Sequence, residues 1–189
     1  MLISHKYEFV FIHVHRTGGT SIINLLKREL GNDVDEISEH GNVNSSEQVL
    51  IDKYPNYRII GFVRNPWARI LSWYSLINKW NDITIEESRK EYQDFLEFRL
   101  AAKPDDRYFH YNQLDYFPDV GDRIVEFYQF ENFEMEAKRI LGNLSLGSCE
   151  IPVTNKTKTK IYQDFYTKES RDLILEICNR DIAYFKYDF

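Results

Sequence analysis

Residues 13–21, HVHRTGGTS, combine side chains that could hold an anion. They separate two strongly apolar segments, residues 9–12 and 22–26. The polar and small members are Arg16, Thr17, Gly18, Gly19, Thr20 and Ser21. Glycines let a backbone approach oxygen atoms closely, and the N–H groups and dipole at a helix start attract negative charge. Hydroxyl groups add donors and an arginine adds a fixed charge. A bare Gly-Gly pair would indicate only a tight turn, but the strand–turn–helix context predicts a phosphate-like anion site.

The loop differs from the phosphate loop of nucleoside triphosphatases. That loop has the pattern G-x-x-x-x-G-K-[ST], and its lysine and first glycine have no counterpart here. A magnesium-dependent kinase is therefore disfavoured. An atypical nucleotide-binding kinase remains an alternative, but neither of the two strands that precede these motifs ends in the aspartate that would hold magnesium.

A second motif, GFVRNPWARILSWY, occupies residues 61–74. Arg64 follows an apolar strand-like segment, at the position where ligands of open α/β sheets bind. Asn65-Pro66 is typical of a helix start, and Ser72 comes about two helical turns after Arg64. Taken alone, Arg64 and Arg69 would be read as solvated surface charges. Beside the first loop, they indicate a second anion site, as a nucleotide with two separated phosphate groups requires.

The hydrophobic pattern predicts strands that alternate with helices. The expected strands are residues 7–14, 57–63 and 124–128, and the expected helices are residues 21–30, 86–100, 131–141 and 169–185. Residues 31–46 are polar and are expected to form a loop, with a short strand near Val34. This alternation predicts an α/β fold with a parallel sheet, in a single domain of residues 1–189.

Composition excludes several classes of function. The formal net charge of −6 disfavours nucleic-acid binding, although a local basic site can exist in an acidic protein. No apolar stretch has the length of a membrane span, and no signal peptide is expected. Cys149 and Cys178 lack metal or redox spacing, so we expect reduced thiols in a cytoplasmic protein. No residue cluster has metal-ligand spacing, so no metal is expected.

The two motifs together resemble the sulfotransferases that use 3′-phosphoadenosine 5′-phosphosulfate (PAPS), in their carbohydrate-type, family 2-like branch. Relatives carry P-K-T-G-G-T-S and R-[ND]-P-x-x-R-x-x-S-x-Y. The segments YNQLDYF (residues 111–117) and YQFENF (residues 128–133) also resemble family segments, so nearly the whole chain is covered. The resemblance implies a P-loop-like three-layer fold with a central parallel sheet flanked by helices. It also implies metal-free in-line transfer from PAPS to an acceptor hydroxyl, expected on a glycan, with PAP as product. A non-catalytic nucleotide-binding domain is the remaining alternative.

The resemblance also implies which residues bind the cofactor. These are Arg16, Thr17, Gly18, Gly19, Thr20, Ser21, Arg64, Ser72, Lys156 and Lys158. Arg16 stands where relatives have a lysine that contacts the leaving group. An arginine can stabilise the charge on the departing phosphate, but it does not give up a proton. Arg16 is therefore expected to act in catalysis by electrostatic stabilisation.

The acceptor hydroxyl needs a general base, and the resemblance favours His40. Its imidazole has a suitable pKa near neutrality. Glu39 is the reserve, because other branches of the family use a glutamate. His15 borders the loop and could touch the sulfate, whereas His110 and Gln113 are candidates to face the acceptor. His13 lies in an apolar strand and is expected to be a buried core residue.

Overall fold

The computed structural model describes residues 1–38, 45–78, 85–101, 109–117, 123, 125–145 and 161–189. Two compact units are present. The first unit comprises Met1–Arg64 with Asp115–Asn155, and the second comprises Asn65–Leu114 with Lys156–Phe189. The predicted site residues His40, Lys156 and Lys158 lie outside the described residues.

The first unit is built on a mixed sheet of five strands in the order β3-β1-β2-β4-β5. The strands are β1 Leu2–Ser4, β2 Phe9–Ile12, β3 Asp35–Glu36, β4 Arg58–Val63 and β5 Val125–Gln129. β2, β4 and β5 are parallel, which confirms the predicted parallel core. β3 lies beside the short strand expected near Val34, whereas β1 and its antiparallel pairing with both β2 and β3 were not predicted. The reason is the tight turn at residues 5–8, which can join only antiparallel neighbours.

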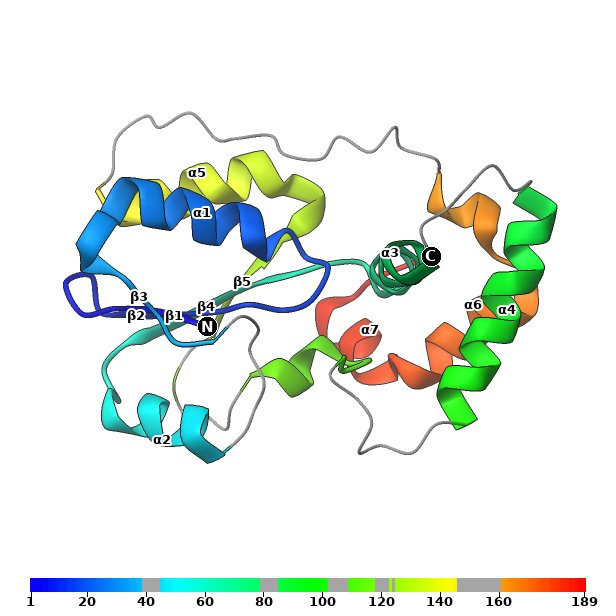
Figure 1. Cartoon of the computed structure of the whole chain (residues 1–189), viewed down its shortest axis with the longest axis horizontal. Helices are drawn as coiled ribbons and strands as arrows, with labels where there is room; N and C mark the ends of the chain where they lie inside the picture. The colour runs from blue at the N-terminus through cyan, green and yellow to red at the C-terminus, as the bar shows by residue number, and fades with distance from the viewer. Residues whose placement is uncertain (39–44, 79–84, 102–108, 118–122, 124, 146–160) are drawn as a thin grey trace. The chain divides into compact units, whose positions relative to one another are not determined.

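Helices cover both faces of this sheet (Figure 1). Phe9 and Phe11 of β2 pack in one hydrophobic cluster with residues of α1 (Gly19–Leu30) and α5 (Phe133–Asn143). Val10 and Ile12 point to the other face, into a cluster that includes Ile51 of α2 (Ser45–Lys53). A strand whose alternate side chains are all buried reads as a continuous apolar run, which is why β2 was predictable. The loop expected over residues 31–46 ends slightly earlier, because α2, a helix that the sequence did not predict, begins at Ser45.

The second unit is helical and has an aromatic core. Its α-helices are α3 Pro66–Asn78, α4 Ile85–Ala101, α6 Lys168–Ile177 and α7 Asn179–Phe185. Trp73 of α3 stacks on Phe109, with ring centroids 3.9 Å apart. Asn65 caps α3 as predicted, because its side-chain oxygen accepts from the backbone N–H of Trp67 and Ala68. Among the described residues of the chain, no helix is both long and apolar enough to cross a membrane.

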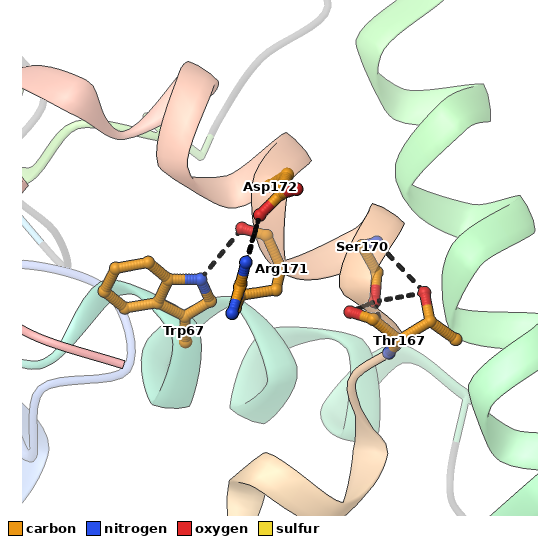
Figure 2. A network of polar contacts seen from close by, with 5 residues as sticks. All are labelled: Trp67, Thr167, Ser170, Arg171 and Asp172. Carbon is orange, nitrogen blue, oxygen red and sulfur yellow. Dashed lines mark hydrogen bonds and ion pairs between the residues drawn. The ribbon is translucent and has the colours of Figure 1, made fainter.

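The last predicted helix, residues 169–185, is two helices that meet at the buried Cys178. α6 begins at a capping box, in which Thr167 and Ser170 exchange side-chain and backbone hydrogen bonds (Figure 2). The same figure shows the indole N–H of Trp67 donating to the backbone carbonyl of Arg171, at 3.0 Å. The capping box thus sets where α6 begins, and the hydrogen bond from Trp67 joins α6 to α3 within the second unit.

Candidate active site

The anion loop of the first unit connects β2 to α1 and depends on glycine at position 18. Gly18 is the N-cap of α1 and has a φ of 77°, in the left-handed region that disfavours side chains. A Cβ atom at this position would also lie 2.8 Å from Cε2 of Phe130 and 2.9 Å from Cε2 of Phe133. These two aromatic rings therefore lie directly against the loop backbone. Sequence reasoning did not assign them a role, although they stand in the family-like segment at residues 128–133.

Gly19, the first residue of α1, is required because of His13. A Cβ atom on Gly19 would fall 2.0 Å from Cδ2 of the His13 ring, which is far inside contact distance. His13 is 4% exposed, which confirms the expectation of a buried histidine. The ring of His13 thus supports the loop from the protein interior.

The hydroxyl residues of the loop divide into two groups. Thr17 is fully buried, and its hydroxyl donates to the carbonyl oxygen of Val14 at 2.9 Å. Thr17 therefore closes the loop on itself through its side chain. Thr20 is exposed and Ser21 is half-buried in the first turn of α1, where the backbone N–H of Ser21 donates to the carbonyl oxygen of Gly18 at 3.0 Å.

The electrostatics of this end of α1 favour an anion. The first turn contains no acidic residue, and no side chain accepts a capping hydrogen bond there. Arg16 precedes it with a φ of 66°, in the same left-handed region. Burial lowers the pKa of the Arg16 guanidinium from its ordinary value, but an arginine remains protonated in proteins. The positive end of the helix dipole and a half-buried cation therefore belong to one loop.

Arg64 reaches this loop from the neighbouring strand. It follows β4 directly, and its Nη1 donates to the backbone carbonyl oxygen of Arg16 at 3.2 Å. Its guanidinium also lies over the ring of Phe130, 4.5 Å from the centroid. Because β2 and β4 are adjacent parallel strands, their carboxyl ends lie at the same edge of the sheet. The structure thus brings the two sequence motifs together at Arg16 and Arg64.

Arg69 and Ser72 belong to α3 in the second unit. Ser72 is half-buried. Arg69 is fully buried, and its guanidinium donates at 2.7 Å to the carbonyl oxygens of both His110 and Tyr111. A solvated surface charge, the reading that would hold for Arg69 taken alone, is therefore excluded, because its guanidinium is buried and donates to backbone carbonyl groups inside the unit.

Other candidates for the acceptor side have structural contacts. Gln113 is fully buried, and its side-chain amide donates to Asp181 at 3.0 Å. Burial raises the pKa of Asp181, although backbone N–H groups of Gln113 and Leu114 donate to its carboxylate and oppose the rise. His110 is half-buried. Glu39, the reserve base, lies outside the described residues, as does His40.

His15 has a partner that the sequence did not reveal. Its Nδ1 is 2.8 Å from the hydroxyl of Tyr116, so the two share a hydrogen bond. Tyr116 stands in the family-like segment at residues 111–117, and that segment was the only sequence signal for it. Among the described residues, no group of three or more His, Cys, Asp or Glu side chains could hold a metal ion.

The comparison with family models agrees with the family indicated by the motifs. The model of the sulfotransferase family, in its family 2 form, matches residues 1–188. A crystal structure of a sulfotransferase from Alicyclobacillus acidocaldarius is similar over 96% of each chain, at 15% sequence identity and a TM-score of 0.48. A comparison with curated proteins found no match.

Proposed function

Because the chain belongs to the sulfotransferase family, which its match over residues 1–188 shows, we propose that PAPS is its sulfuryl donor and a glycan hydroxyl its acceptor. The observation that carries this proposal is the hydrogen bond from Arg64 to the backbone of Arg16. PAPS has anionic groups at two ends of its nucleoside, the 5′-phosphosulfate and the 3′-phosphate. Two cationic side chains on adjacent strand ends suit such a ligand.

The residues of the first unit fit the donor chemically. At Gly18 and Gly19 the space that a Cβ atom would need is taken by aromatic and histidine rings, so only glycine lets the loop backbone pack against these rings. We assign the 5′-phosphosulfate to this loop, with Arg16, Thr20 and Ser21, and the 3′-phosphate to Arg64. The assignments of Ser72, Lys156 and Lys158 to the cofactor remain proposals that rest on the sequence.

Sulfuryl transfer resembles phosphoryl transfer, in which positioning and charge stabilisation supply most of the rate enhancement. PAPS supplies the activated sulfuryl group. Arg16 stabilises negative charge on the oxygen that departs with PAP, and because it keeps its proton, its contribution is electrostatic. We propose His40 as the base that accepts the proton of the acceptor hydroxyl.

Calorimetry with PAP in the absence of metal, compared with ATP plus magnesium, tests the donor. We expect PAP to bind more tightly, because only PAP has the 3′-phosphate that Arg64 is proposed to hold. Equal or stronger binding of ATP would contradict the proposal and favour the kinase alternative.

Incubation with labelled PAPS and a panel of glycans, lipids and small hydroxyl compounds tests the acceptor. Label transferred to a glycan supports the proposal. Label transferred only to a non-sugar hydroxyl would show that the acceptor is not a glycan, and the assignment of PAPS as donor would stand. PAP binding without transfer to any compound in the panel would favour a non-catalytic nucleotide-binding domain.

A further inference from the structure

The hydrogen bond between His15 and Tyr116 fixes a histidine ring at the edge of the anion loop. His15 is half-buried and directly precedes Arg16, whereas Tyr116 is 1% exposed. The rings lie 5.5 Å apart, and the tyrosine hydroxyl is 2.8 Å from Nδ1. One nitrogen of the imidazole is therefore engaged by the protein interior, which sets the plane and the direction of the ring.

Tyr116 is itself held in place by its neighbour in sequence. Phe117 packs on β4, where a Cβ atom on Gly61 would lie 2.6 Å from Cζ of its ring. Phe117 also contacts Phe127 of β5 edge to face, at 5.0 Å between centroids. Because Phe117 packs against two strands and Tyr116 is buried, the tyrosine hydroxyl has little freedom. A rigid partner of this kind is what an oriented polar group needs.

We propose that His15 donates a hydrogen bond from Nε2 to an oxygen of the sulfuryl end of the donor, and that Tyr116 positions His15 for this contact. The inference rests on the proposed function, and it extends that function by a residue that recognises the transferred group. When the tyrosine hydroxyl donates to Nδ1, the ring proton of a neutral imidazole resides on Nε2, which is then a donor. No proton is transferred in this role, so the contact stabilises charge and orients the group.

Two amide variants separate the two nitrogen atoms of His15. The side-chain amide of His15→Asn can place a hydrogen-bonding partner for the Tyr116 hydroxyl at the position of Nδ1. The amide of His15→Gln can place a donor at the position of Nε2. A residue that contacts the donor through Nε2 is therefore rescued by glutamine, whereas a residue that only supports Tyr116 is rescued by asparagine. Tyr116→Phe removes the hydroxyl alone and keeps the buried ring, so it tests positioning without opening a cavity.

The chain contains a matched control pair. His5 and Tyr57 share the same kind of hydrogen bond, from Nδ1 to the hydroxyl at 2.9 Å, at an exposed site. They precede β2 and β4, respectively, and so lie at the opposite ends of these strands from the loop. His5→Asn, His5→Gln and Tyr57→Phe are therefore expected to leave donor binding unchanged.

The measurement is calorimetric affinity for PAPS and for PAP, which needs no acceptor, together with the thermal midpoint of each variant. PAP lacks the sulfuryl group, so loss of the proposed contact affects PAPS alone. We expect His15→Asn to weaken PAPS binding by about tenfold or more, since hydrogen bonds to charged groups are strong, while PAP affinity stays the same. His15→Gln should retain most of the PAPS affinity, and Tyr116→Phe should lose about threefold through poorer orientation of the ring.

The outcomes distinguish this inference from the proposed function. If the unaltered protein binds PAPS and PAP but His15→Asn weakens both equally or neither, the inference is wrong and the function stands. The inference is also overturned if His15→Asn keeps its PAPS affinity and His15→Gln loses it, because His15 would then only support Tyr116. If His15→Asn does not fold, the PAPS-to-PAP affinity ratio of Tyr116→Phe decides, and an unchanged ratio refutes the inference. If the unaltered protein binds neither nucleotide, the proposed function fails and the inference falls with it.

Discussion

The two ends of strands β2 and β4 use the same residue types in different ways. At the amino ends, Arg58 makes two hydrogen bonds to the carboxylate of Glu126, at 2.7 and 2.8 Å, and the His5–Tyr57 pair is exposed. At the carboxyl ends, Arg64 donates to a backbone carbonyl and lies over an aromatic ring. The histidine–tyrosine pair there is anchored on a buried tyrosine.

The difference lies in what each arginine contacts. A carboxylate cancels the charge of a guanidinium, whereas a carbonyl oxygen or a ring face orients the guanidinium without adding a negative charge. The contact with Glu126 at the amino ends joins β4 to β5 on the surface. The contacts at the carboxyl ends hold a cation beside the N-terminus of α1. If nucleotide binding depends on the carboxyl ends alone, substitutions there should weaken it and substitutions at the amino ends should not.

Gly19→Ala is expected to have the largest effect, because it places a Cβ atom inside the His13 ring. The ring or the loop must move, and overpacking of this kind typically costs about 1–3 kcal/mol of stability. PAP binding should fall below detection, since the loop backbone that we propose to hold the 5′-phosphate is displaced. Calorimetry and urea unfolding of the variant measure both effects.

Gly142→Ala is the matched control for this substitution. Gly142 lies near the end of α5, and a Cβ atom there would have no atom within 4 Å. Alanine in a helix is favoured over glycine by up to about 1 kcal/mol, so stability should be equal or higher and PAP affinity unchanged. Normal PAP binding by Gly19→Ala would show that the loop backbone does not contact the nucleotide.

Arg16 tests whether the carboxyl ends act in the transition state as well as in binding. Arg16→Ala should lower the single-turnover transfer rate by about 10²–10³-fold, as loss of one preorganised donor does in other enzymes. PAPS affinity should fall much less, because the charge on the departing phosphate develops only during transfer, whereas PAP already has that charge. Arg16→Lys should restore much of the rate. Equal proportional losses of rate and affinity in Arg16→Ala would make Arg16 a ground-state anchor.

The local parts of this site could be predicted from the sequence because their signals are local. An apolar run, a glycine pair and an amphipathic helix stand consecutively, so β2, the loop and α1 were predicted with small errors at their ends. Arg64 was placed by the same logic, since it directly follows the apolar run that forms β4. The parallel order of β2 and β4 then brings both motifs to one edge of the sheet.

The remaining features depend on contacts between distant residues, which periodicity does not reveal. Arg69 was interpreted together with Arg64 as part of a second anion site, and its observed partners are the carbonyl groups of His110 and Tyr111. Tyr116 and His15 are 101 residues apart in the sequence. Thr17 was assigned to the ligand by residue type, but the structure directs its hydroxyl to Val14. In each case residue type was informative about chemistry, and only the fold identified the partner.

Arg64→Ala and Arg58→Ala compare the two ends of one strand directly. Arg64→Ala should weaken PAP binding by about 1.5–3 kcal/mol, the range for a hydrogen bond to a charged group. Arg58→Ala should leave PAP affinity within about twofold, because exposed ion pairs contribute little beyond their own contact. Isothermal titration of both variants makes the measurement. Indistinguishable affinities would mean that the amino and carboxyl ends do not differ in nucleotide binding.

The smallest effect is expected at the ion pair of the amino ends, and it concerns stability alone. The hydrogen bond from Arg58 holds the pKa of the Glu126 carboxyl below its usual range, against an opposing effect of burial. Because the folded-state pKa is depressed, this stabilisation is present above the unfolded-state pKa of about 4.3 and is lost as the pH falls through the folded-state value. Both side chains are partly exposed, with relative accessibilities of 38% and 30%, so solvent screening limits the contribution to about 0.2–1 kcal/mol.

Glu126→Gln should therefore be slightly less stable to urea than the unaltered protein at pH 7, and the gap should narrow as the pH is lowered below about 4. PAP affinity at pH 7 should be the same for both. A stability gap that is constant with pH would show that the carboxylate charge does not stabilise the sheet, and a fall in PAP affinity would show that the amino ends also influence nucleotide binding.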